Sequence, residues 1–118
     1  MPETELRDVF ENYLNAFVAA SVAEQERLLR ASAAEDVMFS NPGVSGRGLS
    51  NLLGHISAFQ QRFAGAYFRI NWFRQQHGQM LAEWTQFNQD GTEFITANSY
   101  ARCDENGRIV QFAGFWAQ

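Results

Sequence analysis

Residues 67–117 read YFRINWFRQQHGQMLAEWTQFNQDGTEFITANSYARCDENGRIVQFAGFWA, and this stretch decides the fold. It holds four aromatic-rich segments, which are Tyr67–Gln76, Gln79–Asn88, Thr92–Cys103 and Arg108–Ala117. The turns between them are His77-Gly78, Gln89-Asp90-Gly91 and Asp104-Glu105-Asn106-Gly107. Asp or Asn beside Gly supplies the positive φ that tight turns need, and strands joined so closely pair with their sequence neighbours. The second half of the chain therefore predicts a four-strand antiparallel meander.

The first half of the chain has the apolar spacing of helices. Apolar residues recur every three or four positions in a first helix predicted over residues 4–20. A capping box made by Ser21 and Glu24 opens a second helix, which runs to about residue 33. The same periodicity predicts a third helix over residues 49–63.

A short strand and a loop connect the second and third helices. The strand is predicted at residues 37–39, and it runs into the glycine-rich loop at residues 43–48. The glycine spacing of this loop does not match a dinucleotide or phosphate loop. With helices first and strands afterwards, the order predicts an α+β fold in which a curved sheet wraps around a helix. Such an architecture tends to enclose a pocket.

The composition favours one soluble domain over residues 1–118. The chain is 46% hydrophobic and 19% charged, which is too apolar for disorder, and its apolar runs are too short to cross a bilayer. Its first residues are acidic rather than signal-like, so we expect a cytoplasmic protein. A lone Cys103 excludes an internal disulfide. The net charge of -4 argues against nucleic acid as a partner.

The order of elements resembles the nuclear transport factor 2-like superfamily, and in particular its SnoaL-like branch of ketosteroid isomerase and polyketide cyclase relatives. The resemblance covers nearly the whole chain. Its most specific part is the end, where an acidic turn with Gly107 leads into Arg108-Ile109 and a final Gly-Phe-Trp. The resemblance implies an α+β cone, in which the antiparallel meander and a short N-terminal strand enclose a pocket, and it implies a homodimer.

The motif of the ketosteroid isomerases can be carried over position by position. Their oxyanion-hole tyrosine falls on Tyr13, their general-base carboxylate falls on Asn41, and their protonated aspartate falls on Ser99. Two of these three positions depart from the motif. An amide does not accept a proton at neutral pH, and a serine is a weaker donor than a carboxylic acid. Ketosteroid isomerase chemistry is therefore not expected here.

Three residues are the candidate catalytic groups: Tyr13, His55 and Asn41. Tyr13 would donate to a carbonyl or an oxyanion, although its ring could equally belong to the core. Helical spacing places His55 near the inner face of the third helix, where it is either the proton acceptor of the pocket or a hydrogen-bonded boundary residue. Asn41 either faces the ligand or caps its own loop with an Asx-type hydrogen bond.

Further residues are predicted to line the pocket, and they are Phe17, Trp84, Ser99, Phe112 and Trp116. Phe112 and Trp116 share one face of the last strand, and the resemblance places that face beside Ser99. Core packing explains these aromatic residues equally well. On the strand before, alternation puts Trp84 and Glu83 on opposite faces, and we expect Glu83 to point outward.

Two functional hypotheses follow. In the first, the chain is a SnoaL-like small-molecule-binding protein with an apolar carbonyl-bearing ligand in an enclosed pocket. As an enzyme, such a protein would perform proton transfer, dehydration, cyclisation or hydration. In the second, it is a non-catalytic homodimeric protein-interaction module. No cofactor, metal, nucleic-acid partner or membrane contact is expected in either case.

Overall fold

The computed structural model describes residues 3–117. Its elements are α1 (Glu3–Ala16), α2 (Val22–Ser32), β1 (Ala33–Asn41), β2 (Val44–Arg47), α3 (Leu49–Arg62), β3 (Tyr67–Gln76), β4 (Gln79–Phe87), β5 (Glu93–Cys103) and β6 (Ile109–Phe115). The predicted meander is confirmed, because β3, β4, β5 and β6 each pair antiparallel with their sequence neighbours. None of the described helices is long and apolar enough to cross a membrane.

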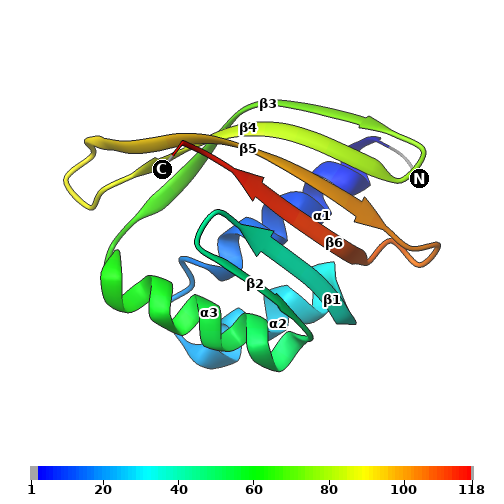
Figure 1. Cartoon of the computed structure of the whole chain (residues 1–118), viewed down its shortest axis with the longest axis horizontal. Coiled ribbons are helices and arrows are strands. Elements are labelled where there is room, and N and C mark those ends of the chain that lie inside the picture. The colour runs from blue at the N-terminus through cyan, green and yellow to red at the C-terminus, as the bar shows by residue number, and fades with distance from the viewer. Residues whose placement is uncertain (1–2, 118) are drawn as a thin grey trace.

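The strands form one six-stranded mixed sheet in the order β2-β1-β6-β5-β4-β3 (Figure 1). β1 pairs in parallel with β6, the last strand of the meander, and antiparallel with β2. Because β2 and β3 are free edges, the sheet curves without closing. The fold class is α+β, as predicted.

The sequence predictions for residues 33–48 need correction. The strand expected at residues 37–39 extends over Ala33–Asn41, and the predicted glycine-rich loop contains strand β2. Phe39 of β1 lies opposite Gly46 of β2. A Cβ atom at Gly46 would lie 2.6 Å from Cζ of the Phe39 ring, so this glycine makes room for the ring rather than for a ligand phosphate.

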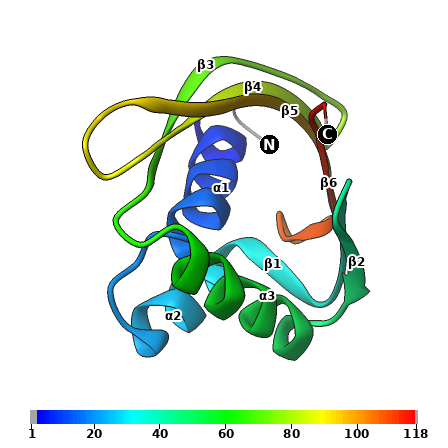
Figure 2. The ribbon, with the colours of Figure 1, turned by 60° about the vertical axis from the view of Figure 1, so that its left-hand side comes forward.

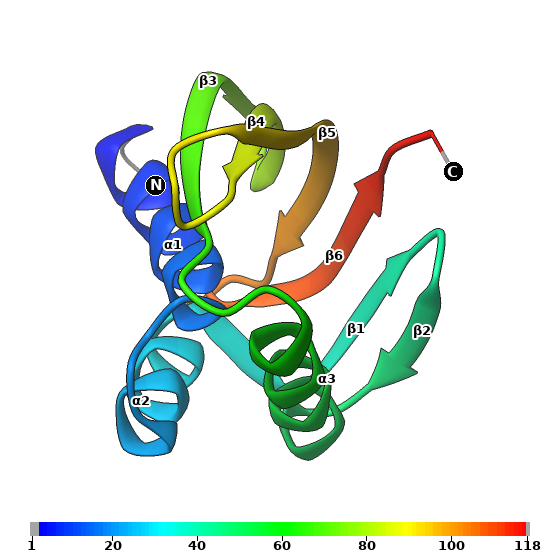
Figure 3. The same cartoon turned by 90° about the vertical axis from the view of Figure 1, so that its left-hand side faces the viewer.

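Register shifts occur in four strand pairs of the sheet, and two of them are one-residue bulges beside β4. Asn71 is the extra residue of β3 opposite β4, and Phe94 is the extra residue of β5 opposite β4. Bulges of this kind increase the local twist of a strand and redirect side chains. In Figures 2 and 3 the sheet curls around α1, α3 faces its concave side, and α2 lies farther from the meander, below α1. The convex outer face is left uncovered by the other described elements.

Helix α1 packs against the concave face of the sheet. Phe10 of α1 is fully buried, with its ring centroid 5.6 Å from that of Phe73 on β3 and 5.5 Å from that of Phe112 on β6. α1 ends at Ala16, four residues earlier than predicted, and the chain turns toward α2. The predicted cap of α2 is present, since the Glu24 amide donates to Ser21 Oγ at 3.1 Å.

A pair of glutamines fixes the helices relative to one another. Gln60 Nε2 of α3 donates to the carbonyl oxygens of Phe17, at 3.0 Å, and Ala19, at 2.7 Å. Gln25 Nε2 of α2 donates to Gln60 Oε1 at 3.1 Å. These bonds tie α3 to α2 and to the segment after α1, and they hold Phe17 where it faces the space between α3 and the sheet.

Candidate functional site

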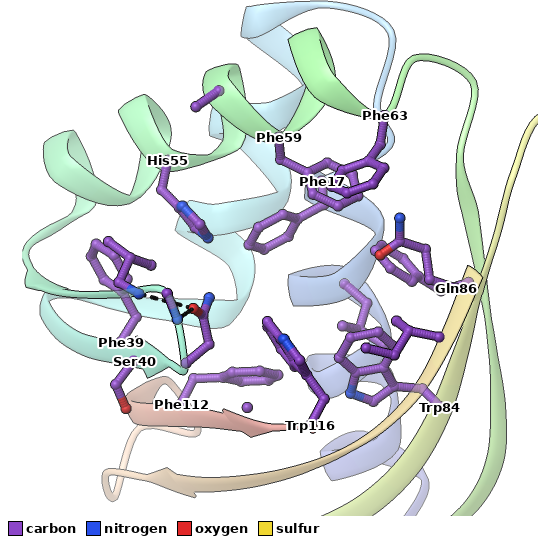
Figure 4. Close-up of a pocket in the computed structure, with 18 of the residues that line it drawn as sticks. Phe17, Phe39, Ser40, His55, Phe59, Phe63, Trp84, Gln86, Phe112 and Trp116 are labelled. Carbon is purple, nitrogen blue, oxygen red and sulfur yellow. Dashed lines mark hydrogen bonds between the residues drawn. The ribbon is translucent and has the colours of Figure 1, made fainter. Parts of the chain in front are cut away.

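A pocket of about 710 Å³ lies between α3, the end of α1 and the inner face of the sheet (Figure 4). A pocket of this size and apolar character is typical of a small-molecule site. Ten of its 23 lining residues are aromatic, and these are Tyr13, Phe17, Phe39, Phe59, Phe63, Phe68, Trp84, Phe94, Phe112 and Trp116. The wall comes from α1, α3 and all six strands, and β2 contributes Val44 alone.

His55 lines the pocket from α3, and Figure 4 shows its imidazole extending from the helix into the cavity. Its ring is stacked on Phe39 at a centroid distance of 5.8 Å and meets the edge of Phe17 at 5.7 Å. No described side chain or backbone group is hydrogen-bonded to either ring nitrogen. Burial among these rings lowers the pKa of His55. The imidazole is therefore neutral at pH 7 and able to accept a proton.

Tyr13 is a wall of the same pocket and is fully buried. Its ring is stacked on Phe112 with centroids 4.1 Å apart, so the core reading and the pocket reading of this residue hold together. Burial raises the pKa of the Tyr13 hydroxyl, which keeps the proton on the oxygen. Among the described residues the hydroxyl has no hydrogen-bond partner, which leaves it as a donor for a ligand.

Asn41 lines the pocket at the end of β1, and only the oxygen of its side-chain amide is hydrogen-bonded to described residues. The Asn41 Oδ1 atom accepts from the backbone N–H of Gly43 at 2.8 Å and of Val44 at 3.0 Å, bonds that Figure 4 draws as dashed lines. This is the capping role that the sequence allowed. Because the oxygen is held by the turn, the Nδ2 donor is the part of the amide left for a ligand.

The predicted lining residues separate into two groups. Phe17, Trp84, Phe112 and Trp116 all line the pocket. Ser99 does not, because it is fully buried behind the indole of Trp84. The Trp84 Nε1–H donates to Ser99 Oγ at 2.8 Å. The Ser99 hydroxyl therefore positions a wall residue and is not a group that a ligand can reach.

Comparisons with solved structures identify the fold. A candidate isomerase of the SnoaL-like family from Agrobacterium tumefaciens superposes with a TM-score of 0.89 at 21% identity, over 98% of this chain and 99% of that chain. A candidate polyketide cyclase from Sinorhizobium meliloti has a TM-score of 0.74 at 15% identity, over 97% and 99%. An NTF2-like protein of unknown function from an Exiguobacterium species has a TM-score of 0.72 at 16% identity, over 90% and 95%.

The chain has the same fold as these SnoaL-like and NTF2-like structures. No protein-family model and no curated protein matches the sequence. At these identities the likeness concerns the fold alone, so the chemistry of the site must come from the residues of this chain.

Three polar residues of this pocket were not predicted from the sequence, and they are Ser40, Gln86 and Arg62. Gln86 of β4 lines it and is only 4% exposed, and its Nε2 atom is enclosed without a hydrogen-bond partner. Arg62, at the end of α3, also lines it. Gln86 and Arg62 could have been found by periodicity, because Gln86 lies two residues after Trp84 on a strand and Arg62 lies seven after His55 on a helix.

The electrostatic character of the pocket follows from what lines it. Among the described lining residues the titratable groups are Tyr13, His55 and Arg62, and none is a carboxylate. Glu83 lies on the outer face, where its Oε2 atom accepts from Asn71 Nδ2 at 3.0 Å. The described residues also contain no group of three His, Cys, Asp or Glu that could hold a metal ion. The pocket as described favours neutral or anionic ligands over cationic ones.

Proposed function

We propose that the protein binds an apolar, carbonyl-bearing small molecule in this pocket and catalyses proton transfer next to its carbonyl group. One observation carries the proposal: a neutral imidazole and two donors free of described partners, the Tyr13 hydroxyl and Asn41 Nδ2, line one aromatic pocket. The names of the similar structures, a candidate isomerase and a candidate polyketide cyclase, belong to the same broad class of chemistry.

Each of the three residues has a distinct role in this proposal. His55 removes a proton from the carbon beside the carbonyl, and the negative charge that develops on the carbonyl oxygen is stabilised by hydrogen bonds from Tyr13 and Asn41. His55 then returns the proton to another position of the ligand. An enolate of this kind serves double-bond isomerisation beside a carbonyl, aldol-type cyclisation, and the loss or addition of water across the α,β bond.

Tyr13, His55 and Asn41 are connected through the same two residues, Phe39 and Phe112. His55 stacks on Phe39, which lies opposite Phe112 in the parallel pair of β1 and β6. The ring of Phe112 in turn stacks on the ring of Tyr13. Asn41 follows Phe39 by two residues, so it lies on the same face of β1. These contacts support a single end of the pocket, the carbonyl end, formed by Tyr13, Asn41 and His55.

Acetylnaphthalene, an apolar aromatic ketone, is a suitable probe of the proposal. It is expected to raise the melting temperature of the purified protein with the logarithm of its concentration. Tyr13→Phe should weaken binding about tenfold, because one hydrogen bond of about 1.4 kcal/mol is lost. Tyr67→Phe, on the outer face, is the matched control. Equal affinities for acetylnaphthalene and ethylnaphthalene, or no effect of Tyr13→Phe, would contradict the proposed role of the carbonyl.

The homodimer remains a proposal, and the outer face of the sheet supports it. This face presents Leu81, which is 45% exposed, and Phe115, which is 59% exposed. We expect sedimentation to show a dimer at micromolar concentration and Leu81→Arg with Phe115→Arg to make it monomeric. Val22→Glu, which changes an exposed apolar residue of α2, should leave the dimer intact. A monomeric wild-type protein would overturn this expectation.

A cytoplasmic location also stays a prediction.

A further inference from the structure

The pocket has a second polar end, which the proposed chemistry does not use. Gln86 points inward from β4, where it lies opposite Phe68 of β3 and Ile95 of β5. Its Nε2 atom is enclosed without a partner among the described residues, and a buried unpaired donor destabilises the folded state. Figure 4 places this side chain on the sheet wall of the pocket, whereas His55 extends from α3. The amide is available to a ligand that brings an acceptor.

Arg62 borders the same end. Its guanidinium lies 4.9 Å from the centroid of the Phe63 ring, and the Phe63 ring lies 4.8 Å from that of Phe94. Phe94 is the bulged residue beside Ile95, which is the partner of Gln86. No carboxylate of the described residues forms an ion pair with Arg62. One cation and one amide donor thus border one end of the pocket, the distal end, defined by Arg62 and Gln86.

The distance between the two ends follows from the spacing of His55 and Arg62 on α3, and the pocket wall between the two ends is apolar. His55 and Arg62 are seven residues apart on α3, so they lie on the same helix face at an axial separation of roughly 10 Å. Between them the wall is made by Phe17, Phe59 and Phe68, with ring centroids 5.5 Å and 5.8 Å apart in succession. A ligand that fills the pocket must be apolar along its middle.

We propose that the ligand is an elongated apolar keto acid, whose carboxylate is bound at the distal end by Arg62 and Gln86. This inference rests on the proposed function, which places the keto group at the other end. A carboxylate fits because its planar pair of oxygens accepts two parallel bonds from a guanidinium and has lone pairs left for an amide. The absence of carboxylates from the described lining removes the repulsion that would oppose such a ligand.

Three matched probes test the inference: acetylnaphthoic acid with its two groups at opposite ends of the ring system, the methyl ester of this acid, and acetylnaphthalene. We expect the acid to bind about tenfold more tightly than either neutral probe, as measured by titration calorimetry. Because Arg62 is exposed, this preference should decrease as the salt concentration rises.

Variants of the distal end decide which residues produce the preference. Arg62→Gln and Gln86→Leu should each lower the ratio of acid to ester affinity several-fold, whereas Arg69→Gln on the outer face should keep it. Gln86→Leu should also raise the melting temperature of the free protein, because an unpaired buried donor is removed. A merely structural role for Gln86 would lower the melting temperature instead.

Each remaining outcome has a definite meaning. If the neutral ketone binds and the acid binds no more tightly, the keto acid is wrong and the proposed function stands. If the preference for the acid survives both distal variants, the assignment to Arg62 and Gln86 is wrong. If none of the three probes binds, the proposed function fails and the inference fails with it.

Discussion

Replacing His55 with glutamine is expected to slow proton exchange at the acetyl group of bound acetylnaphthalene about a hundredfold or more. His55 is the only described lining residue whose ordinary pKa lies near neutrality, so no other lining group can take over as the base. The exchange is measured in heavy water, by nuclear magnetic resonance, as deuterium replaces the acetyl hydrogens. Affinity for the ketone should change far less than the exchange rate.

The matched control is His77→Asn. His77 is exposed in the turn after β3 and has a φ of 44°, a conformation that asparagine tolerates well. This variant should exchange protons at the wild-type rate. An exchange rate that is unaffected by His55→Gln would remove the imidazole from the mechanism and leave the pocket as a binding site only.

The pH dependence of the exchange has a definite sign. Burial lowers the pKa of His55 below its ordinary value, so the base is already neutral at pH 7. The rate limited by this group should therefore be near its plateau at neutral pH, and the midpoint of its decrease should lie below about pH 6.5. The folded state also binds fewer protons than the unfolded state between the two pKa values. The contribution of His55 to stability is thus complete above the unfolded pKa and decreases as the pH falls below it.

Replacing Phe10 with alanine is expected to lower the free energy of unfolding by about 3–5 kcal/mol. Phe10 is fully buried, and its ring contacts Phe73 on β3 and Phe112 on β6, which are well separated in the sheet. Removing the ring leaves a cavity that neither strand can fill without breaking the curve of the sheet. Denaturation by urea, followed by fluorescence, measures the loss.

The control for this variant is Val22→Ala, at an exposed position of α2. It should change the free energy of unfolding by less than about 0.5 kcal/mol. The Phe10 variant should also weaken ligand binding, because Phe112 supports both Phe10 and the stacked ring of Tyr13. A loss under 1 kcal/mol would mean that α1 is not anchored by this contact.

The sequence predicted the meander well because its information is local. The glycines of all three turns have positive φ, with values of 73° at Gly78, 89° at Gly91 and 77° at Gly107. Turn residues of this kind fix which strands become neighbours without any knowledge of the rest of the chain. The strand β2 was missed for the opposite reason, since Gly46 is explained only by the ring of Phe39 on the neighbouring strand.

In the candidate site, too, some residues could be placed from the sequence and others could not. Periodicity placed Tyr13 and His55 on inward faces, and both line the pocket. Ser99 was expected in the lining because the resemblance to the ketosteroid isomerases placed it there, and it lies instead behind Trp84. The bulge at Phe94 adds one residue to β5 and breaks the alternation, so no count along the strand could place that ring.

The parallel pairing of β1 with β6 has a consequence for when the site comes into existence. Each antiparallel hairpin joins neighbours in sequence, whereas this pair joins strands from the two halves of the chain. Closing so long a loop is entropically costly, and contacts of this range form late in folding. We therefore expect the face that carries Asn41 and the face that carries Phe112 to meet late in folding. On this expectation the carbonyl end of the pocket forms after the hairpins, and ligand binding would report a nearly complete fold.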